Sequence, residues 1–100
     1  ERVPRVIPPD PRLLERRRRI AAQIRAARLH ADLSQQDVIR RTGMDRSAYQ
    51  DIEAGRASPL LDSLLRIADA IGVPLAHLVR EERPPLPREA QGPPSGPPGP

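Results

Sequence analysis

Hydrophobic residues recur at helical spacing over the first third of the chain. At intervals of seven, four and three positions, one face carries Leu13, Ile20, Ile24 and Ala27. Asp10 can cap the start of such a helix, and Pro11 suits its first position, where the backbone N–H that proline lacks would have no partner. Asp32 can end it, because aspartate tolerates the left-handed conformation. We therefore predict a helix from Arg12 to about Ala31 that turns this apolar face toward a core.

The next stretch, from Ser34 to Gly55, predicts two short helices around a tight turn. Ser34 and Asp45 are candidate N-caps, and Asp37 lies three positions after Ser34, where a carboxylate favours the positive helix end. Gly43 provides the break, and Gly55 suits the end of the second helix. The expected inward-facing residues are Val38 and Ile39 in the first helix, and Met44, Ile52 and either Ala48 or Tyr49 in the second. Two short capped helices around such a turn are typical of a helix-turn-helix.

Two further amphipathic segments complete an all-α pattern of five helices. The fourth helix, which could start at Ser58–Pro59 or at Leu60, ends at Gly72, and its shared apolar face consists of Leu61, Leu64, Ile67, Ala68 and Ile71. The last helix is short, from Leu75 to about Arg80, with core positions at Leu75, Leu78 and Val79.

Both ends of the chain have a different composition. Residues 1–11 contain four prolines and predict an extended or disordered arm, whose Arg2 and Arg5 could reach a groove of DNA. Residues 84–100 are rich in proline and glycine and predict a disordered tail. We therefore expect one folded domain at residues 12–83.

Composition limits the class of protein further. The chain has no cysteine, and Tyr49 is its single aromatic residue, so the core must be aliphatic and no thiolate metal site is expected. No apolar run approaches the roughly 18 residues of a membrane span. The start of the sequence carries no apolar signal segment. These features lead us to expect a cytoplasmic protein without membrane contact.

The positive charge is concentrated near the N-terminus. The net charge is +4, yet residues 1–30 carry nine arginines against three acidic residues, while residues 31–83 carry seven against nine. The basic run Arg16–Arg19 wraps a whole helical turn, so it is either a solvated turn or a source of one or two phosphate contacts. The acidic middle implies that DNA binding would depend on specific geometry more than on net charge.

We find no sequence pattern for catalysis or cofactor binding. His30, Asp32 and Ser34 lie close together, but at a helix end and without a third group to complete a proton relay. His30 and His77 are too few for a metal site, there is no phosphate-binding glycine loop, and no small-molecule site is evident. We therefore expect a protein that is not an enzyme and has no cofactor.

From Ile20 to Val79 the sequence resembles the phage repressor/Cro type of helix-turn-helix domain, the XRE family. The resemblance is carried by IAAQIRAARLHADLSQQDVI, TGMDRSAYQDIEAG and SPLLDSLLRIADAIGVPLAHLV. The first and last of these are similar to small actinobacterial regulators. The resemblance implies a five-helix, lambda-repressor-like bundle whose third helix enters the major groove of double-stranded DNA, usually as a homodimer.

The resemblance also implies roles for individual residues. Positions that match base-contacting residues of the family, or lie beside them, are Arg46, Ser47, Gln50 and Asp51. Gln35 matches a phosphate-contacting position, and Arg56 is a plausible phosphate partner. Glu53 matches a structural acid that pairs with an arginine of the first helix, here Arg28. Apart from the resemblance, Leu60 and Leu65 are surplus to the inferred core, and together with Pro74 and His77 they could form a modest dimer patch; the alternative is that they are ordinary exposed apolar side chains.

Three residues depart from the family's pattern where the second and third helices meet. Ile39 replaces a usual alanine, Thr42 a usual apolar residue, and Tyr49 a usual aliphatic one. A bulky Ile39 should push the helices apart or rotate them. We therefore expect the angle of the third helix to differ from the family's.

The function that the resemblance implies is a sequence-specific DNA-binding transcriptional regulator. An antitoxin-like role in a larger system remains an alternative, as does a protein–protein interaction module with weak or lost DNA binding. The acidic middle and Ile39 favour the interaction module.

Overall fold

The computed structural model describes residues 10–82, and these form five helices and no strand. In chain order they are α1 (Pro11–His30), α2 (Gln35–Thr42), α3 (Arg46–Glu53), α4 (Leu61–Ile71) and α5 (Leu75–Val79). The prediction of an all-α bundle of five helices is confirmed. The predicted N-terminal arm, with Arg2 and Arg5, lies almost wholly outside the described residues, and the predicted Pro/Gly-rich tail lies outside them entirely.

Local side-chain chemistry sets the helix ends where the sequence indicated. Asp10 accepts a hydrogen bond from the Arg12 backbone N–H at 2.8 Å, and Pro11 occupies the first turn of α1. Ser34 and Asp37 form a reciprocal capping box on α2, and Asp45 caps α3. Asp32 adopts the left-handed conformation, with φ 61°, just after α1. Leu60 precedes α4 without a side-chain cap, so that helix starts at the later of the two predicted positions.

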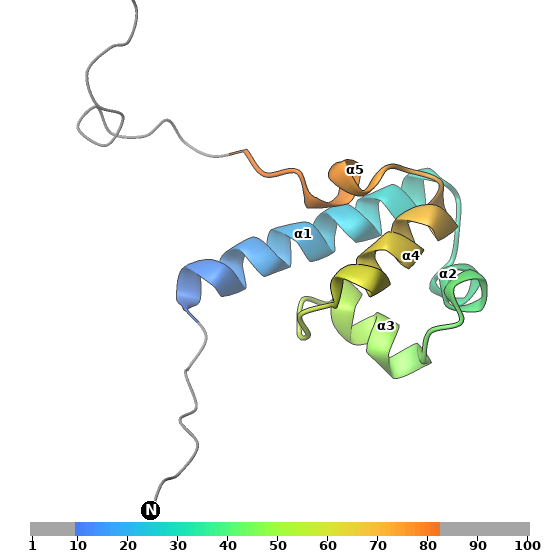
Figure 1. Cartoon of the computed structure of the whole chain (residues 1–100), viewed down its shortest axis with the longest axis horizontal. Helices are drawn as coiled ribbons and strands as arrows, with labels where there is room; N and C mark the ends of the chain where they lie inside the picture. Colours follow the sequence, from blue (N-terminus) through green and yellow to red (C-terminus); the bar gives the residue numbers. More distant parts are fainter. Residues whose placement is uncertain (1–9, 83–100) are drawn as a thin grey trace, which may run out of the picture.

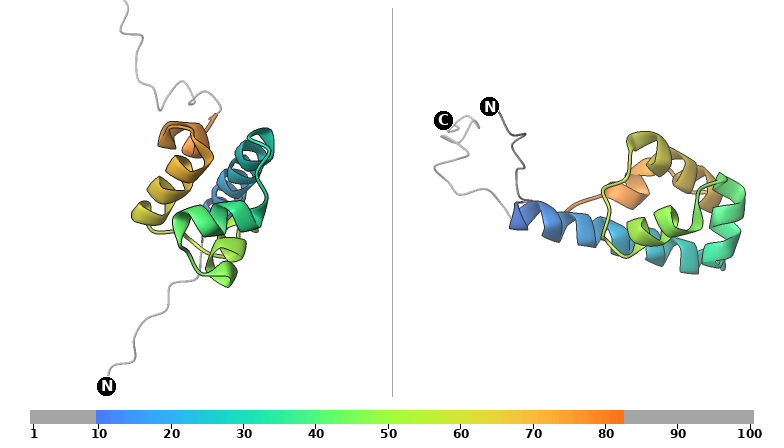
Figure 2. Two further views of the ribbon diagram at one scale, coloured as in Figure 1. Left: turned by 90° about the vertical axis from the view of Figure 1, so that its right-hand side faces the viewer. Right: turned by 90° about the horizontal axis from the view of Figure 1, so that it is seen from below.

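The helices enclose one aliphatic core. α1 packs against α3 and α5, while α4 packs against α2 and α5. The two helices α2 and α3 lie together at one side of α1 and α4 (Figures 1 and 2). The buried apolar residues are Ala21, Ile24, Ala27, Val38, Ile39, Tyr49, Ile52, Ile67, Ala68, Ile71 and Leu78.

Two predicted core residues are instead exposed. Leu13 is 56% exposed and Leu61 is 61% exposed. The prediction for Leu13 was wrong because the first turns of α1 extend beyond the other helices (Figure 1). Leu61 is the first residue of α4 and lies at the exposed start of that helix. In α3 Tyr49 is the buried residue of the two candidates, and Ala48 is exposed.

No helix among residues 10–82 is long and apolar enough to cross a membrane.

Candidate nucleic-acid interface

The turn between α2 and α3 is fixed by hydrogen bonds of its own residues. Gly43 has φ 73°, a left-handed conformation that ends α2. The Thr42 hydroxyl donates to the Val38 carbonyl at 2.8 Å and accepts from the Met44 backbone N–H at 3.2 Å. Thr42 therefore ties the last turn of α2 to the backbone of the turn that follows it.

A buried ion pair joins α3 to α1. Arg28 donates to both carboxylate oxygens of Glu53, at 2.8 Å each, and the two side chains are only 8% and 2% exposed. This is the pair that the sequence predicted. Arg28 also donates to the Leu33 carbonyl at 2.9 Å, which ties the loop after α1 to the same cluster. The pair fixes the C-terminal end of α3 against α1.

Two more side chains complete the cluster around Glu53. Gln35, at the start of α2, donates to Glu53 at 2.8 Å, and the Tyr49 hydroxyl donates to the other carboxylate oxygen. Burial opposes ionisation of Glu53, but the hydrogen bonds from Arg28, Tyr49 and Gln35 outweigh it and hold its pKa below the ordinary value. Burial, together with the hydrogen bond to Glu53, raises the pKa of Tyr49. The buried side of α3 is thus an ionised, hydrogen-bonded contact with α1 and α2.

The opposite side of α3 is exposed and polar. Arg46 and Ser47 lie exposed in its first turn, and Gln50 and Asp51 are half-buried one turn later. The structure therefore places all four predicted base-contacting residues on one helix, and none of them belongs to its buried set of Tyr49, Ile52 and Glu53.

Each of these four side chains has a partner that orients it. Arg46 donates to the amide oxygen of Gln36 on α2, a residue that the sequence analysis did not assign to the site. Ser47 donates to Asp45 at 2.7 Å, and this bond lowers the pKa of Asp45. The link between Arg46 and Gln36 spans the turn, so no spacing within one helix could have indicated it.

The predicted phosphate-contacting residues lie beside the same face. Gln35 accepts a hydrogen bond from the Gln50 amide at 3.3 Å, which connects the two predicted contacts through the edge of the buried cluster. Arg56 forms an ion pair with Asp51, with nitrogen–oxygen distances of 3.0 and 2.9 Å. Both side chains of that pair are about half exposed or more, so solvent and an incoming phosphate can reach them.

The dimer candidates are exposed residues in α4 and α5 or directly before them. Leu60 is 74% exposed and Leu65 is 42% exposed, and Pro74 and His77 are exposed as well.

Comparisons with known proteins agree with this architecture. A family model described as helix-turn-helix matches residues 24–78. The chain is 34% identical over 61 residues to the transcriptional repressor RstR of the cryptic phage CTXphi from Vibrio cholerae. That match covers 61% of this chain and 55% of the repressor, so the chain spans about half of the relative's length.

Two solved structures are also similar. The restriction-modification controller protein C.AhdI from Aeromonas hydrophila matches with a TM-score of 0.59 and 26% identity, over 61% of this chain and 92% of the controller protein. The hypothetical transcription factor NHTF from Neisseria matches with a TM-score of 0.59 and 24% identity, over 90% of this chain and 93% of that protein, which shows a shared fold. Because the family model covers more than half of the chain and the helices and turn match its description, the chain belongs to the helix-turn-helix family of the phage repressor/Cro type.

Proposed function

We propose that the chain is a sequence-specific DNA-binding transcriptional regulator that inserts α3 into the major groove of an operator as a homodimer. The observation that carries this proposal is the two-sided character of α3. Tyr49, Ile52 and Glu53 are buried, while Arg46 and Ser47 are exposed in the first turn of the helix, directly after its N-cap. The names of the relatives, a transcriptional repressor and a controller protein, support the same role.

The side chains of this face suit the edges of base pairs. The planar guanidinium of Arg46 can donate twice to guanine O6 and N7, and the Gln36 amide would hold it in place while it does so. Gln50 can pair with adenine N6 and N7, and the Ser47 hydroxyl with several bases. These contacts would set the preference for an operator.

Asp51 and Arg56 act as a pair in this proposal. An isolated carboxylate near phosphates would be repelled, but the contact with Arg56 offsets the charge of Asp51. Asp51 can then accept from cytosine N4 while an outer nitrogen of Arg56 reaches a phosphate. The second amide hydrogen of Gln35 is available for the adjoining phosphate, because only one is given to Glu53.

The homodimer would use the exposed side chains Leu60, Leu65, Pro74 and His77. Their burial in a twofold interface would place two copies of α3 on successive turns of DNA, about 34 Å apart. A cytoplasmic location is consistent with a regulator that binds DNA, and occupying an operator requires no catalytic step.

A protein–protein interaction module is the second candidate, either alone or in an antitoxin-like system. The observation that favours it is the charge of residues 31–83, where acidic residues outnumber arginines. Such a module would not require the polar side chains of α3 to be arranged for contact with base pairs.

A mobility-shift titration with genomic DNA fragments at two salt concentrations tests the proposal. Arg46→Ala should weaken binding to the preferred fragment by roughly 10- to 100-fold, the value of one bidentate base contact. Arg66→Ala is the matched control. It removes an exposed arginine of α4 instead of α3, and this variant should bind DNA like the wild type. Absence of any shift at low salt would refute DNA binding and leave the interaction module.

A further inference from the structure

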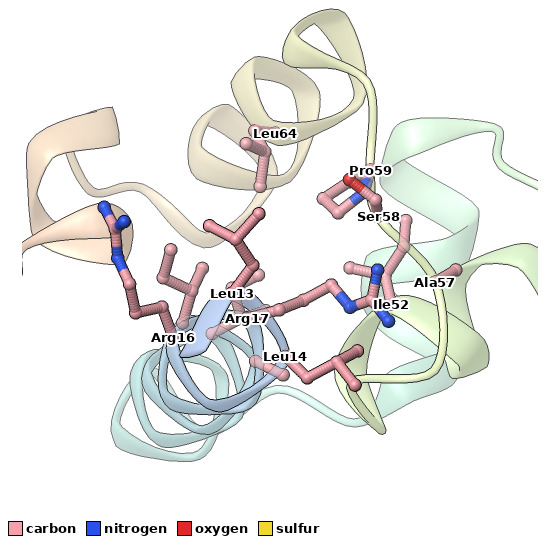
Figure 3. Close-up of a pocket in the computed structure, with 12 residues that line it drawn as sticks. Leu13, Leu14, Arg16, Arg17, Ile52, Ala57, Ser58, Pro59 and Leu64 are labelled. Carbon is pink, nitrogen blue, oxygen red and sulfur yellow. The ribbon is translucent and has the colours of Figure 1, made fainter. Parts of the chain in front are cut away.

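A cavity lies on the side of α1 where its first turns pass the end of α3 and the loop before α4. Its volume is about 380 Å³, within the range of roughly 300–1,000 Å³ that is typical of small-molecule sites. The walls are mainly apolar and include Leu13, Ile20, Ile52 and Leu64 (Figure 3). The sequence indicated no small-molecule site, because these residues come from three helices that only the fold brings together.

Two arginines line this cavity, and they differ in their partners. Arg16 forms a bidentate ion pair with Glu81, at 2.6 and 2.7 Å, so its charge is compensated. Arg17 extends across the cavity toward Ile52 and Ala57 (Figure 3). Its Nε is buried and has no hydrogen-bond partner among residues 10–82. A buried donor without a partner is costly, and the guanidinium charge of Arg17 forms no ion pair among residues 10–82, so it stands uncompensated beside this cavity.

We propose that this cavity binds a small amphipathic carboxylate, with the carboxylate on Arg17 and an apolar tail against Leu13, Ile20 and Leu64. A carboxylate matches both the charge of the guanidinium and its parallel N–H donors. The tail would cover the exposed part of Leu13, and removing this apolar surface from water would favour binding. A cationic ligand would be repelled by Arg17, and a neutral one would lack the charge-assisted bond.

Methyl-detected NMR titration of the full chain tests this proposal directly. The probe is sodium octanoate, kept below micelle-forming concentrations, with 1-octanol and octyltrimethylammonium as neutral and cationic counterparts. Octanoate should shift the methyl signals of Leu13, Ile20 and Leu64 in a saturable way. Octanol should bind at least about tenfold more weakly, since a hydrogen bond to a charged group is lost. Because the readout is binding itself, the result does not depend on whether the chain binds DNA.

Two variants assign the effect to the cavity. Arg17→Met keeps an apolar stem of similar length and should weaken octanoate binding to the level of octanol. Arg19→Met makes the same change at an exposed arginine of α1 outside the cavity and should leave binding unchanged. Ala57→Leu fills the cavity without altering its charge and should abolish binding of both probes. Methyl signals of the core on the far side of the bundle report that each variant is folded.

Several results would overturn the proposal. They are the absence of a saturable shift, equal binding of octanoate and octyltrimethylammonium, and unchanged octanoate affinity in Arg17→Met. Contacts between the cavity methyl groups and residues 1–9, seen together with no octanoate binding, would show that the chain itself occupies the cavity.

Discussion

Glu53 connects three helices through one carboxylate. It accepts hydrogen bonds from Arg28 on α1, Gln35 on α2 and Tyr49 on its own helix. The ion pair was predictable, because the resemblance supplied both positions. The hydrogen bond from Tyr49 to Glu53 was not predictable, because the sequence shows an aromatic residue in a usually aliphatic position but not where its hydroxyl points. The contact of Gln36 with Arg46 was equally hidden, because it depends on the geometry of the turn.

Removal of the Glu53 charge should be strongly destabilising. Glu53→Gln preserves the shape of the side chain but leaves Arg28 charged and buried, which costs roughly 3–5 kcal/mol. Urea denaturation measures the change in the free energy of unfolding. Glu15→Gln is the control, since the pair of Glu15 with Arg19 is exposed, and it should change that free energy by about 1 kcal/mol at most. Similar values for the two variants would contradict the role of the buried pair.

The depressed pKa of Glu53 also predicts how stability depends on pH. Its folded-state pKa lies below the ordinary value of 4.5, so its contribution is complete above that pH and is lost as pH falls through the folded-state pKa. Asp37 and Asp45, whose pKa values are also lowered by hydrogen bonds, contribute with the same sign. Urea denaturation below pH 4.5 should therefore show a shallower loss of stability in Glu53→Gln than in the wild type. An identical pH dependence would rule out Glu53 as a contributor.

Helix boundaries were predicted well, because caps and turn residues act within a few positions. Asp10, Ser34 and Asp45 cap the helices that they were expected to cap. Burial was predicted less well at helix ends. Leu13 and Leu61 have the spacing of core residues but lie in the first turns of their helices, where more than half of each residue is exposed. Periodicity describes one helix, whereas burial depends on what lies opposite it.

The glycines that end α2 and follow α3 should respond differently to the same substitution. Both have positive φ, 73° at Gly43 and 78° at Gly55, so an alanine at either position costs roughly 1–2 kcal/mol of backbone strain. A Cβ at Gly43 meets nothing within 4 Å, whereas at Gly55 it lies 3.2 Å from Arg18 Cγ and 3.5 Å from its Cα. Gly55→Ala should therefore lower the free energy of unfolding more than Gly43→Ala, as measured in urea. The reverse order would contradict the close approach of α1 to this loop.

The arrangement of the helices follows from the family, but the features that distinguish this chain do not. The resemblance covered the bundle and the face of α3 that we propose for DNA. It gave no indication of the cavity, whose walls come from α1, α3, α4 and a loop. Nor did it indicate that Asp51 and Arg56 would compensate each other's charge on that face. The cavity forms only when segments that are distant in the sequence meet, and the Asp51–Arg56 pair depends on how the loop after α3 turns back onto that helix.

Selection of bound sequences from a random pool of double-stranded DNA is the measurement that tests the central claim most directly. The account predicts an enriched pseudo-palindrome whose half-sites lie about one helical turn apart, because each subunit of a dimer would place one α3 in the major groove. The same selection with Arg46→Ala should lose the preference at one position of each half-site. A pool that shows no enriched sequence at low salt would contradict the claim that this chain is a sequence-specific DNA-binding regulator.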